Sequence, residues 1–304
     1  MTLLLAACGG VDDGETERTQ SAAVRGRPAE AMNLPLIERL EAYRPLAIHR
    51  DDAGTIYKLS LVDEQLTRAD LEAVAGLGEL EILLLGGTEV RDDDLKLLGS
   101  LSKLRILGLR NTEVSNEGLP LLEPLQSLES LYLGGTKVTD RGLIALVKLP
   151  ELRSVSLGRN EIHGDGLEAL VQLPNLDHLI LSVTPIDDEA LAVVARISTL
   201  RKLFLAKTAI GDAGVRHLTT LDRLESIELY ETAVTDDVVD ALLQMPGLVS
   251  VDLRGTTLSE DALKRLLEGN PDLKVFSGLS EGKNQVDENR PKTPTNPAPT
   301  ADTP

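Results

Sequence analysis

The chain has 304 residues, enough for one large domain or two domains of average size. Its formal net charge of −18 argues against nucleic-acid binding, because a phosphate-binding surface needs a concentration of Lys and Arg. Hydrophobic residues make up 42% of the chain, yet there is no Trp and only 4 Tyr and 2 Phe. A core built almost entirely from aliphatic side chains indicates many small and similar layers.

The first ten residues, MTLLLAACGG, resemble the lipobox of bacterial lipoproteins. An apolar run and two small residues precede Cys8, which is the residue that would receive the lipid. Because the apolar run is short and no basic residue precedes it, residues 1–8 are interpreted as a truncated lipoprotein signal, with a chance match as the alternative. Acylation would anchor the protein to the bacterial cell envelope through Cys8 alone, whereas an unmodified Cys8 predicts a cytoplasmic protein.

Two segments precede the regular part of the chain. Residues 9–32 are polar and without periodicity, which predicts a disordered tether. Residues 33–56 predict an N-terminal cap made of one helix, with Asn33 as its N-cap residue and Pro35 in its first turn, followed by a hairpin. Such a cap would cover the exposed end of a repeat array.

An apolar pair separated by one residue recurs every 24 residues. The pairs lie at 59/61, 83/85, 107/109, 131/133, 155/157, 179/181, 203/205, 227/229 and 251/253. A polar residue follows each pair at a fixed distance, and these residues are Thr88, Thr112, Thr136, Asn160, Thr184, Thr208, Thr232 and Thr256. The first unit departs from this pattern because Glu64 stands at the corresponding position.

The unit L-x-L-x-x-T-x-[VI]-x-D-x-G-L-x-x-L-x-x-L-x-x-L resembles the leucine-rich repeat of bacterial proteins, with Thr where many such repeats have Asn. The resemblance covers roughly residues 57–276, or about nine repeats. It implies an α/β fold, a curved right-handed leucine-rich repeat solenoid with parallel strands on the concave face and short helices on the convex face. Residues 277–304 are rich in Pro and Thr and predict a disordered tail.

The repeated polar positions predict structural roles. We expect each Thr hydroxyl to bond backbone groups of the neighbouring turn, because a buried hydroxyl without a partner is costly. One carboxylate per repeat cannot supply the 6–8 oxygens that calcium needs, so the Asp residues are expected to cap helix N-termini. These residues are Asp92, Asp140, Asp188, Asp212 and Asp236. A second column, which indicates a close approach at the helix start, consists of Gly118, Gly142, Gly166 and Gly214.

The sequence contains no pattern typical of an enzyme. The four histidines, His49, His163, His178 and His217, have no metal-ligand spacing, and no Gly-rich segment resembles a phosphate-binding loop. We therefore predict no catalytic residue, metal or cofactor. The remaining alternative is a glycan hydrolase with Glu228 and Asp252, on adjacent strands, as its pair of acids.

Function is expected in positions that the repeat does not dictate. The residue between the two apolar members of each pair, and the residue after the pair, should face the concave surface. Apolar and aromatic side chains beside charged ones are typical of protein-binding patches, although the same residues could instead pack on one another. The predicted partner-binding residues are Leu84, Arg110, Tyr132, Ile180, Phe204, Glu228, Tyr230, Asp252 and Arg254.

The sequence therefore predicts a monomeric, non-catalytic scaffold that binds a protein or peptide on its concave face. The alternative is a cytosolic regulator or adaptor of another enzyme that uses the same face. Nucleic acid is excluded as a partner by the charge, and contact with a membrane is expected only through a lipid on Cys8.

Overall fold

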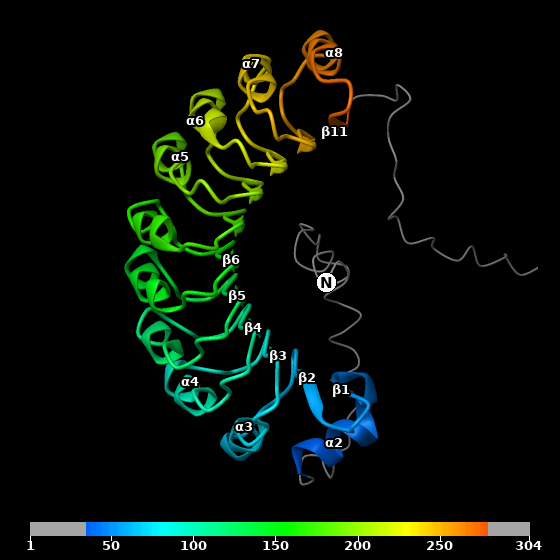
Figure 1. Ribbon diagram of the computed structural model, residues 1–304, viewed down its shortest axis with the longest axis vertical. Helices are drawn as coiled ribbons and strands as arrows, with labels where there is room; N and C mark the ends of the chain where they lie inside the picture. Colours follow the sequence, from blue (N-terminus) through cyan, green and yellow to red (C-terminus); the bar gives the residue numbers. More distant parts are fainter. Residues whose placement is uncertain (1–34, 279–304) are drawn as a thin grey trace, which may run out of the picture.

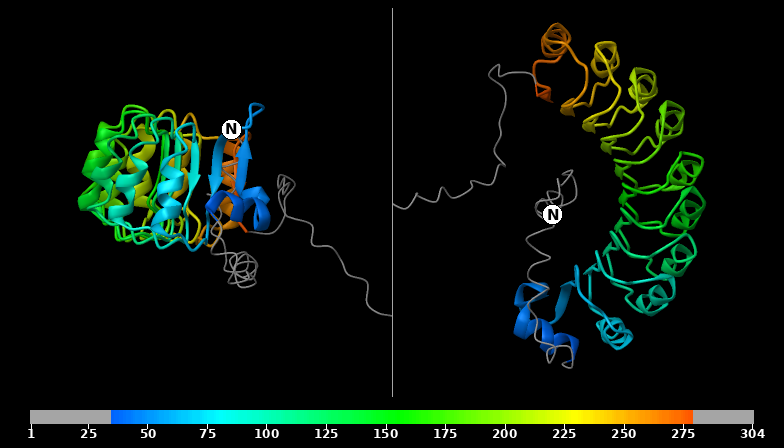
Figure 2. Two further views of the ribbon diagram at one scale, coloured as in Figure 1. Left: turned by 90° about the horizontal axis from the view of Figure 1, so that it is seen from below. Right: turned by 180° about the vertical axis from the view of Figure 1, so that it is seen from behind.

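The computed structural model describes residues 35–278, which form a curved solenoid (Figure 1). Strands line the inner edge of the arc and helices line its outer edge, and two further views show the same arrangement (Figure 2). The order of the strands in the sheet is their order in the sequence, because each 24-residue repeat, called a coil below, ends beside the start of the next. The predicted solenoid, with strands on the concave face and helices on the convex face, is confirmed.

The sheet of the described residues has 11 strands. The first two pair antiparallel, and every later pairing is parallel and in register at steps of 24 residues. The strands are β1 (Ile48–Arg50), β2 (Ile56–Ser60), β3 (Ile82–Leu84), β4 (Ile106–Gly108), β5 (Ser130–Tyr132), β6 (Ser154–Ser156), β7 (His178–Ile180), β8 (Lys202–Phe204), β9 (Ser226–Glu228), β10 (Ser250–Asp252) and β11 (Lys274–Phe276).

Helices are mainly α-helical towards both ends of the arc, and the segments in its centre are 3₁₀. Apolar residues recur every three positions in both kinds of segment, as at Leu95 and Leu98 or at Leu143 and Leu146, and a 3₁₀ helix with about 3.0 residues per turn aligns them on one buried face. The α-helices are α2 (Leu36–Tyr43), α3 (Arg68–Ala75), α4 (Asp92–Leu98), α5 (Asp188–Val194), α6 (Asp212–His217), α7 (Val238–Leu243) and α8 (Glu260–Gly269). The 3₁₀ helices are η3 (Pro45–Ala47), η4 (Leu119–Leu122), η5 (Asp140–Lys148), η6 (Leu167–Gln172) and η7 (Leu218–Thr220).

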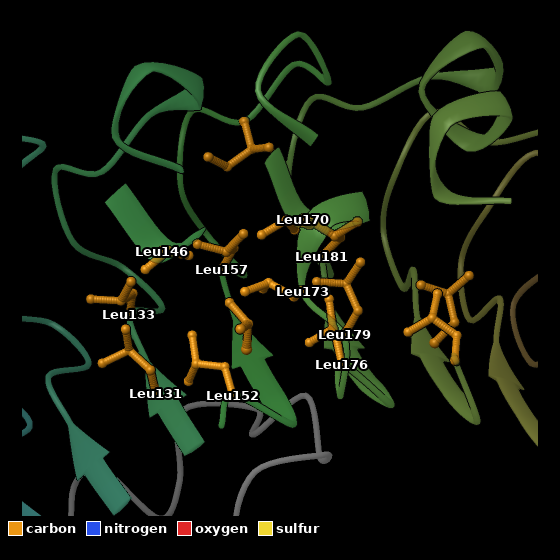
Figure 3. Packing of buried hydrophobic residues seen from close by; sticks show 14 of the residues in the cluster. Leu131, Leu133, Leu146, Leu152, Leu157, Leu170, Leu173, Leu176, Leu179 and Leu181 are labelled. Atoms are coloured by element: carbon orange, nitrogen blue, oxygen red, sulfur yellow. The ribbon is translucent and has the colours of Figure 1, made fainter. Parts of the chain in front are cut away.

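The hydrophobic core is a continuous column of leucines between the strands and the helices (Figure 3). Leu133, Leu157 and Leu181 come from three successive coils, and all three are completely buried. No coil can cover its own apolar side, so each one is buried by its neighbours. Truncating one such leucine to Ala would cost about 2–5 kcal/mol, because the filled column would gain a cavity.

The buried Thr column is satisfied differently from the prediction. Each hydroxyl donates to a carbonyl of its own turn, three residues earlier, as when Thr88 Oγ1 lies 2.6 Å from the carbonyl oxygen of Leu85. The same bond recurs at Thr112, Thr136, Thr184, Thr208, Thr232 and Thr256. The predicted bond to the neighbouring turn was wrong for threonine, because its hydroxyl lies on a short side chain that reaches only the local backbone.

The exception in this column is Asn160, whose longer amide does reach the preceding coil. Its Oδ1 accepts from the N–H of Thr136 at 2.8 Å, and its Nδ2 donates to the carbonyl of Leu133 at 2.8 Å. Asn160 therefore links two coils where the threonines stabilise one turn each.

The Asp column also differs from the prediction. Each Asp lies in or just before the first turn of its convex segment, but its carboxylate accepts from the backbone N–H of the following coil and does not cap its own helix. Asn116 stands at the same position of its repeat and accepts through its amide oxygen in the same way. The acceptors and their donors are Asp92 with Ser115, Asn116 with Thr139, Asp140 with His163, Asp188 with Gly211, Asp212 with Thr235 and Asp236 with Ser259. These bonds connect successive coils along the convex side, and we call them the inter-coil bonds.

The glycine column exists because of these acceptors. A Cβ added to Gly118 would lie 2.3 Å from Oδ1 of Asp92, and one added to Gly214 would lie 2.4 Å from Oδ1 of Asp188. The predicted close approach at the helix start is thus confirmed. In one repeat Gly164 stands at the position where the other repeats have the acceptor Asp or Asn. In the following coil Asp187 caps its own helix α5 by accepting from the N–H of Ala190.

Helix α2 and the hairpin β1–β2 form the N-terminal end of the solenoid, and the hairpin supplies the first two strands of the sheet. The helix begins at Leu36 after Pro35, and Asn33, the predicted N-cap residue, lies outside the described residues. The expectations for residues 1–8, 9–32 and 279–304 fall outside them as well.

Two ion pairs attach this end to the first coils, and one explains why the first repeat lacks a threonine. Arg44 Nη1 lies 2.8 Å from Oε1 of Glu64, whose side chain is completely buried at the Thr position of that repeat. Arg39 Nη2 lies 3.2 Å from Oδ2 of Asp70 on α3, with both side chains buried. Glu64 is therefore the acceptor to which the N-terminal segment binds.

Candidate functional site

The predicted partner-binding residues do lie on the concave face, but they differ in exposure. The middle residue of each apolar pair ends its strand, and the alternation of a strand turns its side chain away from the buried leucines. Tyr132 is only 6% exposed and Ile180 only 7%, so these two side chains pack against their neighbours. The register partners of Tyr132 are Gly108 and Ser156, whose small side chains leave room for the ring to lie against the sheet.

The N-terminal half of the concave face is lined by small residues. Leu84 leans over the next strand, since a Cβ on Gly108 would lie 2.9 Å from its Cδ2 atom. Arg110 lies over the same region, because a Cβ on Gly134 would lie 3.7 Å from its Nε atom. Both side chains are half-buried.

The C-terminal third of the concave face brings the remaining predicted residues together. Tyr230 lies between two cations from adjacent coils, with Lys207 Nζ 5.3 Å and Arg254 Cζ 5.7 Å from the ring centroid. These distances are within the range of cation–π attraction. Lys207, which sequence reasoning did not select, also lies 3.6 Å from a carboxylate oxygen of Glu231.

Two acids occupy neighbouring strands of this region, with Glu228 on β9 and Asp252 on β10 in register. Arg254 holds Asp252 through a short contact of 2.6 Å, and this hydrogen bond raises the pKa of the guanidinium above its ordinary value. Burial raises the pKa of Glu228 to about 7, and the negative charge of Asp252 adds to the effect while Arg254 opposes it. The Glu228 carboxyl is therefore partly neutral near pH 7.

A second feature that sequence reasoning missed is a row of alternating charges at the residue just before each of the strands β3 to β9. Its members, in order, are Glu81, Arg105, Glu129, Arg153, Asp177, Arg201 and Glu225. Arg105 donates to both carboxylate oxygens of Glu129, at 2.9 Å and 3.0 Å, and lies 3.6 Å from Glu81. Reading this position at steps of 24 residues would have revealed the row. Arg105 pairs with Glu81 and Glu129, and Arg201 pairs with Glu225, so this part of the row links successive coils.

The structure offers no competing centre in its described part. The four histidines lie in separate elements, namely β1, a turn, the start of β7 and the end of α6, and His178 contacts the neighbouring Asp177. Within residues 35–278, no group of three or more His, Cys, Asp or Glu side chains could hold a metal ion. In the same range, no helix is both long enough and apolar enough to cross a membrane.

Comparisons with known proteins agree with this geometry. The sequence model of a family described as "Leucine Rich repeat" matches residues 125–147 and 148–171, two adjacent segments in the centre of the arc. No curated protein matches the chain significantly.

Among solved structures, the chain is similar to the crystal structure of internalin C2 from Listeria monocytogenes, with a TM-score of 0.50 and 20% sequence identity. The match covers 70% of this chain and 84% of that chain. At this identity the likeness shows the fold alone. The fold is a leucine-rich repeat solenoid.

Proposed function

We propose that this protein is a non-catalytic scaffold that binds a protein or peptide on the concave face of its solenoid. The observation that carries the proposal is the group of Phe204, Glu228, Tyr230, Asp252 and Arg254 on β8–β10 and the turns that follow β9 and β10. The repeat does not require these residue types, because other coils have Gly, Ser or Ala at the same positions. Arrays of this kind typically use the concave face for binding and are usually non-catalytic.

Site-specific crosslinking in the native cell tests this proposal. The photoreactive residue p-benzoylphenylalanine is placed at Phe204 on the concave face, or at Ile144 on η5 as a matched control on the convex face, where the side chain is 62% exposed. We expect a protein adduct, identified by mass spectrometry, at position 204 and none at position 144. Adducts of the same protein at both positions, or at neither, would contradict the assignment to the concave face.

We also propose that the scaffold is anchored to the bacterial cell envelope by a lipid on Cys8. Support comes from the sequence alone, in which two alanines and a leucine precede Cys8 as in a lipobox. Labelled palmitate should be incorporated into the natural protein and not into a Cys8→Ser variant. Lack of label in both proteins would favour the alternative, a cytosolic regulator or adaptor that uses the same concave face.

A further inference from the structure

Four side chains at the C-terminal end of the concave face stand in register on successive strands. They are Phe204 on β8, Glu228 on β9, Asp252 on β10 and Phe276 on β11. Adjacent strands are about 4.8 Å apart, so two carboxylates lie side by side with a phenyl ring on each flank. We call these four residues the acid–aromatic patch.

Packing of the coils does not explain this patch. Phe276 is 42% exposed on the last strand of the described residues, although burying a phenyl ring is strongly favourable. Phe204 is half-buried, whereas the leucines on either side of it are completely buried. The two rings therefore keep apolar area available beside the carboxylates.

The patch also has an incomplete set of charges. Asp252 has a counter-ion, because the guanidinium of Arg254 contacts both of its oxygens. No hydrogen bond or ion pair from residues 35–278 reaches the half-buried carboxylate of Glu228. Arg254 offsets only part of the rise in the pKa of Glu228, and its guanidinium is bonded to Asp252. A partly desolvated carboxylate without an ion pair of its own is unfavourable, and a second cation supplied by a partner would reduce that cost.

We propose that the acid–aromatic patch binds a Lys or Arg side chain within a basic segment of a partner protein. The cationic group lies against Glu228 and Asp252, and the apolar stem, together with apolar neighbours in the segment, packs on Phe204 and Phe276. Long basic side chains suit such a site because their stems are apolar and their heads also attract ring faces. The net charge of −18 favours the same partners by steering them electrostatically. This inference rests on the proposed function and specifies the chemistry of its ligand.

A peptide of defined charge tests the inference. The probe is fluorescein-labelled Leu-Arg-Leu-Arg-Leu amide, and its matched control has citrulline, which is neutral and similar in shape, in place of both arginines. We expect the purified full-length protein to bind the arginine peptide about tenfold more tightly in fluorescence anisotropy, since a charge-assisted hydrogen bond is about twice as strong as a neutral one. Equal affinities for the two peptides would overturn the inference without any change to the protein.

Two charge-matched variants separate a local contact from the general effect of a negative protein. Glu228→Gln removes one of the two carboxylates of the patch. Glu129→Gln removes an acid that pairs with Arg105 and that lies four coils away from Glu228. We expect about a tenfold loss of affinity for the arginine peptide in Glu228→Gln and less than about a twofold change in Glu129→Gln, because salt screens distant charges. Equal losses in the two variants would overturn the assignment to the patch.

The pH dependence supplies a readout that a merely structural role would not change. The pKa of Glu228 is raised to about 7, so its carboxyl is mostly neutral at pH 6 and mostly ionised at pH 8. Affinity for the arginine peptide should rise about tenfold between these pH values in the natural protein and stay flat in Glu228→Gln. A flat profile in both proteins would count against the patch.

Failure of this inference differs from failure of the proposed function. A partner that crosslinks at position 204 and still binds Glu228→Gln with unchanged affinity would refute the basic-segment assignment and leave the concave scaffold in place. Absence of any adduct at position 204 would refute the scaffold itself.

Discussion

Replacement of Asp140 by Ala should weaken the attachment of one coil to the next and so lower the stability of the protein. The carboxylate of Asp140 accepts three backbone N–H groups of the following coil, from His163 at 2.8 Å, Gly164 at 3.1 Å and Gly166 at 2.9 Å. Asp140→Ala removes all three inter-coil bonds at once and leaves the leucine column unchanged.

The expected cost follows from those three bonds. A hydrogen bond to a charged group contributes about 1.5–3 kcal/mol to stability when its partners have no other acceptor. His163 is exposed and Gly166 is half-buried, so water will replace part of the loss there, whereas Gly164 is buried; we take about 1 kcal/mol for each amide on average. Asp140→Ala should therefore lower the free energy of unfolding by about 3 kcal/mol.

Urea denaturation followed by circular dichroism measures this loss, and hydrogen exchange locates it. The amides of His163, Gly164 and Gly166 should exchange faster in Asp140→Ala, whereas amides of distant coils should change less because each coil contacts only its neighbours. Asp165→Ala is the matched control. Asp165 lies in the turn that carries the three donor amides, is exposed and has the same charge as Asp140. A loss below about 0.5 kcal/mol, or the same loss in both variants, would refute the role of the inter-coil bonds.

Three further changes test other parts of the structure. Glu64→Thr restores the repeat pattern but deprives Arg44 of its buried carboxylate, so we expect a loss of about 2–3 kcal/mol in urea denaturation and faster amide exchange in α2; unchanged exchange there would contradict the binding role of Glu64. Val183 is a β-branched residue with a φ of 60°, so Val183→Asn should gain about 1 kcal/mol in the same assay, and a loss would contradict the strain. The folded-state pKa of Glu228 lies near 7 and above its ordinary value of 4.5, so ionisation opposes folding and stability should fall as pH rises from about 4.5 to 7. In Glu228→Gln this dependence of stability on pH should disappear, and the variant should be about 1–2 kcal/mol more stable than the natural protein at pH 8, a value reduced for the partial exposure of the side chain. If the pH dependence remained in the variant, another group would be its cause.

The 24-residue period was sufficient to predict the solenoid. A repeat that places Leu133, Leu157 and Leu181 at the same phase forces each coil into the same conformation, and stacking is the only way to bury their shared apolar side. The position of the concave residues followed from strand alternation, which holds for Phe204 and Glu228 as it does for any strand residue. The exposure of Tyr132 could not be predicted in this way, because it depends on the small size of Gly108 and Ser156 on the flanking strands.

The sequence by itself determined the coil, its core and the face on which side chains are free to vary, because these depend on periodicity within one chain segment. Only the tertiary structure decided which atoms meet between coils. It showed that Asp140 bonds the next coil, that Thr88 bonds its own turn and that Glu64 receives Arg44. Such partners depend on side-chain length and on the distance between coils to within an ångström or less, and a repeating pattern of letters does not contain that distance.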